Sequence, residues 1–272
     1  MQVLSQRLHR LSLTFPKKQT VPAICVYHRV ELATALDELG LRRSRPTLVL
    51  TGGANHLGQQ AARRLKKFFR QCLVPLAEEL QLTVIDGGTD SGVMRLMGQG
   101  RSAHKATFPL VGVAPACKVH LPQDVPSSGT YPLEPHHTHF ILIPGAEWGT
   151  ESPWIAQLAT AIAGTAPSLT ILINGGSVSL IDVQASLAEH RPVCVMAGTG
   201  RLADEIATAI RSPHTPIRPE LEPVLQAGCQ ANGLSLMDWS KPTRELVAAF
   251  RERLTQSSGF PPTNNPNLTN PR

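Results

Sequence analysis

Short apolar runs alternate with stretches of helical spacing through the middle of the chain. The apolar runs have the length and composition of buried strands. They lie at residues 47–50, 82–85, 110–114, 140–143, 169–173 and 193–196. Between them, apolar residues recur three and four positions apart, as on one face of a helix. This alternation predicts an α/β fold with a mainly parallel sheet and helices on both faces.

The pattern fades on both sides of this core. We expect four parts: a strand-and-helix extension at 1–46, the core at 47–211, helices that pack on the core at 212–255, and a disordered tail at 256–272. The run at 193–196 is then the last strand of the sheet. A helix predicted at 57–80 contains Pro75, which should kink or split it, because proline lacks the backbone N–H.

Five of the predicted strands end in glycine-bearing turns. The carboxyl ends of parallel strands meet at one edge of a sheet, where ligands bind in open α/β folds. Each turn is followed by a predicted helix, whose first N–H groups are unpaired and attract anions. Glycine lets the backbone approach such a ligand closely. The turns therefore predict a site for a phosphate-bearing ligand, and the alternative at each position is a tight turn with a good helix cap.

The candidate ligand-binding residues come from these five turns. They are Gly52, Gly53 and Asn55; Gly87, Gly88, Thr89, Asp90, Ser91 and Gly92; Gly145, Glu147, Gly149 and Thr150; Gly175 and Gly176; and Gly198, Thr199, Gly200 and Arg201. Among them, Gly145, Gly149 and Thr150 are expected to form the main phosphate loop.

Two charged residues of the turns carry specific expectations. Arg201 can pair with a phosphate through two parallel hydrogen bonds, held in place by Asp204, or it can be a solvated residue of the first helical turn. Glu151 is the candidate catalytic residue, as an acid–base group or as an acceptor for ribose hydroxyls. A glutamate at this position is also favourable simply because it lies at a helix N-terminus.

Composition places the chain among soluble globular proteins. It has 272 residues, of which 42% are hydrophobic and 17% charged. No apolar run is long enough to span a membrane, and the first residues lack the apolar segment of a signal peptide, so we expect a cytoplasmic protein. The five cysteines are scattered, which fits a reducing compartment. The net charge of +6 favours anionic partners.

Two further clusters admit more than one interpretation. His136, His137 and His139 suggest zinc, but we expect no metal and interpret His137 and His139 as a structural or pocket-lining pair. The predicted helix with Arg63, Arg64, Lys66, Lys67 and Arg70 offers a nucleic-acid surface or a solvated face. We expect the solvated face, because no aromatic residue interleaves with these cations as a stacking platform. A long proline-rich loop at 116–138 is typical of a functional or mobile segment.

The order of four motifs resembles a known family. The motifs are 87–94, 137–140, 174–176 and 198–204, and their order is similar to that in the N-terminal homology region of TRPM cation channels. The resemblance covers about residues 47–210 and is strongest to freestanding prokaryotic members of the SLOG superfamily (LSDAT type), which also contains the LOG enzymes and DprA. It implies a Rossmann-like, doubly wound fold and a pocket for a nucleotide-derived ligand such as ADP-ribose. It also implies that the chain can form a homodimer, for which the apolar helix at 153–163 is a candidate.

The LOG enzymes carry a Pro-Gly-Gly-x-Gly-Thr-x-x-Glu signature that this chain matches only in its halves. Residues 144–151 read Pro-Gly-Ala-Glu-Trp-Gly-Thr-Glu, and residues 115–139 contain no arginine to replace the one that assists those enzymes. We therefore expect binding and sensing of an ADP-ribose-like ligand rather than catalysis. Hydrolysis of the N-glycosidic bond of a nucleoside monophosphate is the alternative, and nucleic-acid binding is the third interpretation.

Overall fold

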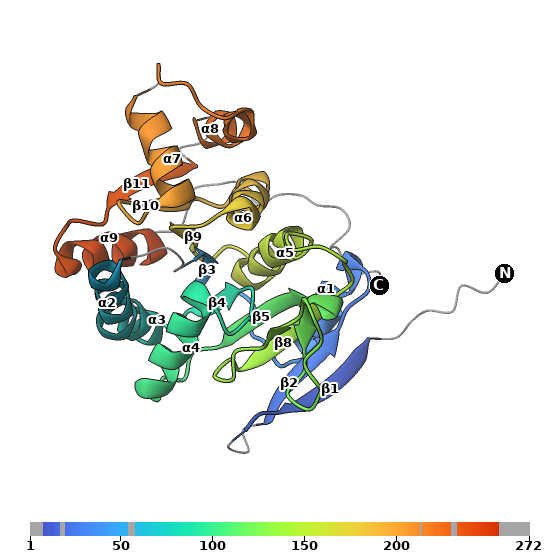
Figure 1. Ribbon diagram of the computed structural model, residues 1–272. Coiled ribbons are helices and arrows are strands. Elements are labelled where there is room, and N and C mark those ends of the chain that lie inside the picture. The colour runs from blue at the N-terminus through green and yellow to red at the C-terminus, as the bar shows by residue number, and fades with distance from the viewer. Residues whose placement is uncertain (1–7, 17–19, 54–57, 213, 230–232, 256–272) are drawn as a thin grey trace.

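A nine-stranded sheet forms the centre of the molecule (Figure 1). The computed structural model describes residues 8–16, 20–53, 58–212, 214–229 and 233–255. In spatial order the strands are β1 (His9–Thr14), β2 (Thr20–Cys25), β8 (His139–Ile143), β5 (Leu110–Pro115), β4 (Thr83–Asp86), β3 (Thr47–Gly52), β9 (Ser168–Ile173), β10 (Val193–Ala197) and β11 (Leu234–Asp238). Only β1 runs antiparallel to its neighbour, so the predicted mainly parallel sheet is confirmed.

The chain winds outward from β3 in both directions. It first adds β4, β5 and β8 on one side of β3 and then returns to place β9 on the other side. This reversal makes a topological switch point between β3 and β9. The connections that follow the carboxyl ends of these two strands lead to helices on opposite faces of the sheet. They leave a crevice between them, which is where open α/β sheets bind ligands.

Helices cover both faces of the sheet, which confirms the doubly wound, Rossmann-like architecture (Figure 1). One face carries α2 (Gln59–Phe68), α3 (Val74–Glu79), α4 (Gly92–Ala103) and α9 (Thr243–Thr255). The other carries α1 (Leu32–Glu38), α5 (Ser152–Ala163), α6 (Ser177–Ala188), α7 (Arg201–Arg211) and α8 (Glu222–Cys229). The apolar residues of α5 are already buried within one chain, including Trp154, Ile155 and Leu158.

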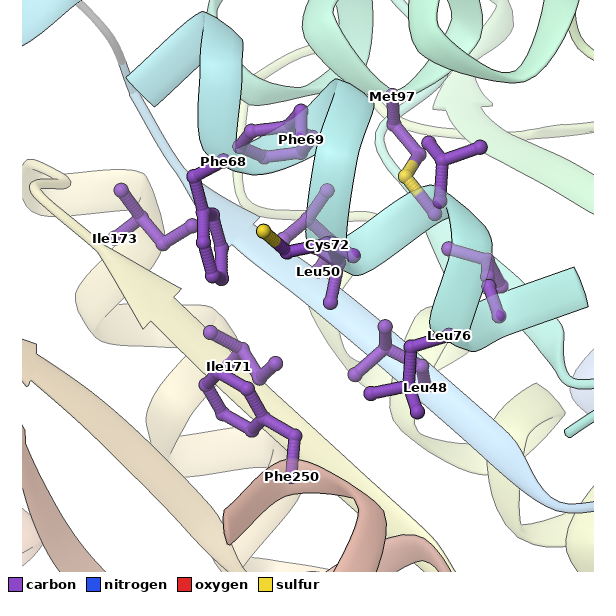
Figure 2. Close-up of a cluster of buried hydrophobic side chains, with 14 of the residues drawn as sticks. Leu48, Leu50, Phe68, Phe69, Cys72, Leu76, Met97, Ile171, Ile173 and Phe250 are labelled. Atoms are coloured by element: carbon purple, nitrogen blue, oxygen red, sulfur yellow. The ribbon is translucent and has the colours of Figure 1, made fainter. Parts of the chain in front are cut away.

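Alternating side chains of β3 join the two layers. Leu48 and Leu50 pack with the α2–α3 layer, whereas Val49 points to the layer of α1 and α5. Figure 2 shows Leu48 near Leu76 and Phe250 beside Ile171 within this cluster. Burial of each aliphatic or aromatic side chain of this kind stabilises the folded state by about 1.5–3 kcal/mol.

The helix predicted at 57–80 is divided, as the position of Pro75 indicates. It consists of α2, a π-helical turn at Phe69–Leu73 and α3, in which Pro75 occupies the first turn. Proline has no N–H to offer the preceding carbonyls, and it is tolerated where a new helix begins. The changed hydrogen-bond pattern before Pro75 accommodates the missing donor.

The sheet extends further at both edges than the sequence pattern indicated. Val193–Met196 is not the last strand, because β11 pairs in parallel with β10 from Val193 opposite Leu234 to Ala197 opposite Asp238. The sequence Leu-Ser-Leu-Met-Asp lacks a continuous apolar run because this edge strand is only partly buried. At the other edge, β1 and β2 form a hairpin that docks on β8.

The proline-rich segment at 116–138 is an ordered cover. It lies on the part of the sheet near β8 and β2, where Val119 and Leu133 are buried against Phe140. Two backbone bonds attach it to the turn after β4: the Asp90 N–H donates to the Pro132 carbonyl at 2.8 Å, and the Glu134 N–H donates to the Gly88 carbonyl at 2.9 Å. The segment therefore reaches the carboxyl edge of the sheet. Among the described residues, no helix combines the length and hydropathy of a membrane span.

Candidate functional site

A pocket of about 300 Å³ opens at the carboxyl edge of the sheet, between the ends of β3 and β4 and the first turns of α5, α6 and α7. Its position is the crevice expected from the switch point. Eight of the residues singled out in the sequence line it: Gly52, Gly53, Gly87, Thr89, Ser91, Glu151, Gly176 and Arg201. Each of the five predicted turns thus contributes to a single pocket.

The other candidate residues are not among those that line the pocket. They are Gly88, Asp90, Gly92, His137, Gly145, Glu147, Gly149, Thr150, Gly175, Gly198, Thr199 and Gly200. Several of them shape the turns. A Cβ on Gly145 would lie 2.6 Å from Thr150 Cγ2, and Thr199 Oγ1 accepts the Asn174 N–H at 2.8 Å. Asn55 falls outside the described residues.

One end of the pocket is acidic. Asp182 on α6 accepts hydrogen bonds from Thr51 Oγ1 and Ser152 Oγ, both at 2.5 Å. Glu151, at the start of α5, is only 4% exposed and accepts the Gly149 N–H at 2.8 Å. Burial, together with the charge of Asp182, raises the pKa of Glu151 to about 7, and burial raises the pKa of Asp182. Neither carboxyl forms an ion pair with any described residue, so both can accept hydrogen bonds, and Glu151 can exchange a proton near neutral pH.

The other end of the pocket is cationic. Arg201 lies against the N-terminus of α6, because a Cβ on Gly176 would come within 2.7 Å of Arg201 Nη2. No side chain caps that terminus, so its first N–H groups are available to an anion. Arg201 also has a φ of 52°, a left-handed conformation that is unusual for a residue with a side chain.

The predicted contact between Asp204 and Arg201 is wrong. Asp204 instead accepts the N–H groups of Gly198 at 2.5 Å and Gly200 at 3.1 Å, as a cap for α7. Within the described chain, Arg201 has no carboxylate partner. An unpaired guanidinium at a free helix N-terminus is a strong phosphate-binding arrangement.

Two aromatic rings stand at the rim of the pocket. Tyr131, from the 116–138 segment, and Trp148, from the turn before α5, have ring centroids 5.7 Å apart and planes at 78°. Tyr131 is 49% exposed. Large aromatic faces that are left accessible to solvent suit the stacking of a planar ring.

His137 lies beneath the turn after β4. Its Nε2 donates to Asp86 Oδ1 at 2.8 Å and its Nδ1 donates to Glu134 Oε2 at 2.9 Å, with all three residues fully buried. Burial alone would lower the pKa of His137, but Asp86 and Glu134 outweigh it and raise this pKa to about 9. Asp86 Oδ1 also accepts the Gly88 N–H at 2.8 Å. The protonated imidazole therefore ties the turn to the 116–138 segment.

The neighbouring His139 is in a different state. Burial lowers its pKa to about 4, so its ring is neutral at physiological pH. The two histidines that share a face in the predicted strand thus differ in charge, with His137 protonated and His139 neutral, and have separate surroundings. In the described ranges, no group of three or more His, Cys, Asp and Glu side chains is arranged to hold a metal ion.

One protein family matches the region that contains these turns. The sequence model of the family described as "SLOG in TRPM, prokaryote" (LSDAT) matches residues 45–238. The chain belongs to the LSDAT family. The match includes β11, which the sequence pattern alone did not indicate, and it confirms the resemblance drawn from the motifs.

The LSDAT chain is also similar to part of several animal channels. It is 26% identical over 282 aligned residues to the mouse protein named transient receptor potential cation channel subfamily M member 2, covering 86% of this chain and 18% of that protein. The rat protein of the same name is 24% identical over the same shares. A Nematostella vectensis protein named subfamily M member-like 2 is 26% identical over 204 residues, covering 60% of this chain and 13% of its own length. The chain thus spans less than a fifth of these relatives.

Among solved structures, the X-ray structure of the protein TM1055 aligns with this chain at a TM-score of 0.47 and 16% identity. The alignment covers 76% of this chain and 98% of that one.

Ten residues that line the pocket were not singled out in the sequence, and three of them carry the chemistry described above: Asp182, Tyr131 and Trp148. Asp182 is the one charged residue of α6, in its second turn, which is a weak signal that a partner lies opposite. Tyr131 belongs to a long loop, where binding residues are common. Their convergence depends on the tertiary arrangement of α5, α6 and the 116–138 segment.

Proposed function

We propose that this LSDAT domain binds a nucleotide-derived, ADP-ribose-like ligand in the pocket at the switch point. The observation that carries the proposal is the combination of three features in one pocket: an unpaired arginine at a free helix N-terminus, two carboxyl groups without a cation, and two accessible aromatic rings. A nucleotide offers an anion, a hydroxyl-bearing sugar and a planar base, and each feature matches one of these parts.

The three parts have natural places in the pocket. Arg201 and the first N–H groups of α6 would hold a phosphate. Glu151 and Asp182 would form hydrogen bonds with ribose hydroxyls, since a carboxyl group accepts in either state and also donates when it is protonated. Tyr131 and Trp148 would pack against the base. Because Tyr131 belongs to the segment that is tied to the turn after β4, binding can be transmitted to that segment, which fits a sensing role.

Isothermal titration calorimetry with ADP-ribose, AMP and adenosine tests this assignment. Replacing Arg201 by Ala should weaken ADP-ribose and AMP about 10- to 100-fold, as expected for the loss of charge-assisted bonds. Adenosine has no phosphate and should be unaffected. Arg211→Ala is a matched control, because Arg211 lies on the same helix and pairs with Asp238 at 3.7 Å, away from the pocket. Absence of binding by all three compounds at millimolar concentration would refute the proposal.

One observation favours N-glycosidic hydrolysis as a second candidate function. Glu151 has a pKa of about 7, so its protonated form is available to a leaving base while Asp182 lies beside it. In such a reaction Glu151 would give its proton to the base nitrogen as the bond from C1′ to that nitrogen breaks. Water would attack C1′ and lose a proton to the neighbouring carboxylate, so the products are the free base and the sugar with a C1′ hydroxyl. Chromatography of AMP after incubation would detect free adenine. Glu151→Gln should abolish that release while calorimetry still detects AMP binding; equal release by the variant excludes Glu151 as the acid.

A further inference from the structure

A stripe of four cations runs along the outer side of α2 and the π-helical turn that follows. Arg63, Lys66, Lys67 and Arg70 are spaced three, four and seven positions apart, so they share one face of the helix. The opposite face is buried through Leu65 and Phe68. All four side chains are exposed.

Several other surface arginines of the molecule pair with a carboxylate, whereas the stripe has no acidic counterpart among the described residues. Arg43 pairs with Asp37, Arg95 with Asp90, Arg218 with Glu205 and Arg251 with Glu79. No carboxylate pairs with any of the four stripe residues in the part of the chain that the structure describes. Like charges at these spacings disfavour the helix by about 0.2–0.5 kcal/mol per pair, which an anionic partner would reverse.

The stripe borders a hollow of about 430 Å³. Its lining consists of the four stripe residues with Gln71 and His104, the residue that follows α4. The lining contains no Phe, Tyr or Trp side chain, and His104 is its one ring, so it offers no row of aromatic faces for the successive bases of a single strand. It also contains no apolar anchor of the kind found at the centre of protein interfaces. These features select a partner that presents regularly spaced anions and little else.

We propose that this basic stripe binds the phosphate backbone of a nucleic-acid duplex without reading its sequence. The seven-residue span corresponds to about 10 Å of helix, and duplex DNA carries one negative charge per about 1.7 Å of its axis. A duplex therefore supplies enough phosphates to pair with all four cations. Its phosphates would meet a hollow in which four of the six lining side chains are cationic donors. The stripe is separate from the nucleotide pocket, because no stripe residue lines that pocket.

Fluorescence anisotropy with a labelled DNA duplex of mixed sequence, at 50–200 mM KCl, tests the stripe. Four phosphate contacts predict a slope of log K against log salt of about −3.6, which is roughly a 150-fold loss of affinity over this range. Lys66→Glu with Lys67→Glu should weaken binding more than tenfold at 50 mM. The matched control is Arg10→Glu with Arg43→Glu, which changes the net charge equally on paired arginines and should change the affinity less than threefold. Circular dichroism confirms that both variants fold.

Several outcomes would overturn the assignment. Equal losses in the two double variants would mean that net charge alone governs binding. Equal competition by a single strand of the same length, or by polyglutamate, would mean that the stripe does not select a duplex. Undetectable binding at 50 mM salt and tens of micromolar protein would remove the proposal altogether. Arg201→Ala should leave duplex binding unchanged, so this result stands apart from the nucleotide proposal.

Discussion

Two buried glutamates lie near the same strand ends and behave in opposite ways. Burial raises the pKa of Glu151 to about 7, and the neighbouring Asp182 adds to the effect. Burial would also raise the pKa of Glu134, but the hydrogen bonds and charges of His137 and His136 outweigh it and lower that pKa. The two side chains are 4% and 0% exposed, so the extent of burial does not separate them.

The difference lies in the partners. Glu134 belongs to a chain of ions in which one imidazolium bridges two carboxyl groups, and a buried charge is tolerated when it is paired in this way. Glu151 faces another carboxyl and receives only a backbone N–H and no cation. The carboxyl groups around His137 therefore have a cation within the fold, although Asp86 Oδ2 is left without a hydrogen bond. The carboxyl pair in the pocket has no cation and is left for something that binds there.

Replacing His137 by Leu should produce the largest effect. The change leaves Asp86 and Glu134 buried without their cation, and removal of one partner of a buried ion pair typically lowers the free energy of unfolding by about 3–5 kcal/mol. Urea denaturation at pH 7 measures it. His139→Leu is the control, because His139 is neutral and should lose only about 1 kcal/mol with its hydrogen bond. Similar losses in both variants would contradict charge compensation by His137.

The pH dependence of stability should separate the two regions. The folded pKa of Glu151 lies above its unfolded value, so its contribution to stability is fully present below pH 4.5 and is lost as pH rises through about 7. The shift corresponds to about 3 kcal/mol. The contribution of His137 to stability is likewise lost as pH rises, but between pH 6.5 and about pH 9. In Glu151→Gln, denaturation curves should lose the dependence between pH 4.5 and 7 and keep the upper one; an unchanged lower window would disprove the assignment.

Gly98 in α4 offers a smaller and sharper test of the His137 cluster. A Cβ at this position would lie 1.9 Å from Glu134 Oε2, whose position is fixed by hydrogen bonds from His136 and His137. In an open helical position, Ala would stabilise by about 1 kcal/mol relative to Gly. Here Gly98→Ala should instead destabilise by about 1–2 kcal/mol, because overpacking outweighs the helix propensity. Thermal denaturation gives the sign, and a rise in the melting temperature would show that Glu134 is free to move.

The smallest expected effect concerns the pair in the pocket. Asp182→Asn removes a charge but keeps an oxygen to accept from Thr51 or Ser152. The pKa of Glu151 should then fall from about 7 only part of the way toward 4.5, because burial, the larger cause, remains. Carbon-13 NMR titration of the Glu151 carboxyl measures this. An unchanged pKa would mean that burial alone sets it.

The sequence predicted those parts of the molecule in which a local pattern decides the structure. The apolar runs that became β3 and β9 are buried on both faces, so each is continuous and easy to recognise. The partly buried β11 has no such run, and pairing with β10 makes it a strand. The glycine turns were found for the same local reason, because their spacing marks strand ends.

The chemistry of the site was less accessible from sequence. Glu151 was identified through its position in a motif, but its pKa is raised first by burial and then by the charge of Asp182, which lies 31 positions further along the chain on another helix. His137 was identified as a histidine of interest, yet its partner Asp86 ends a different strand. Burial and pairing of this kind arise only when distant elements pack together, so periodicity and turn chemistry do not reveal them.

The pairing of β2 with β8 delays the completion of the sheet during synthesis of the chain. Cys25 lies opposite Leu142, so the hairpin of β1 and β2 is made early but has no partner until residues 26–138 have been synthesised. At about 5–20 residues per second, this takes on the order of ten seconds. During that interval one edge of β2 is unpaired and open to other chains. A ribosome stalled before residue 143 would therefore carry a hairpin with an unpaired, aggregation-prone edge. The yield of folded protein should depend on the translation speed through this segment.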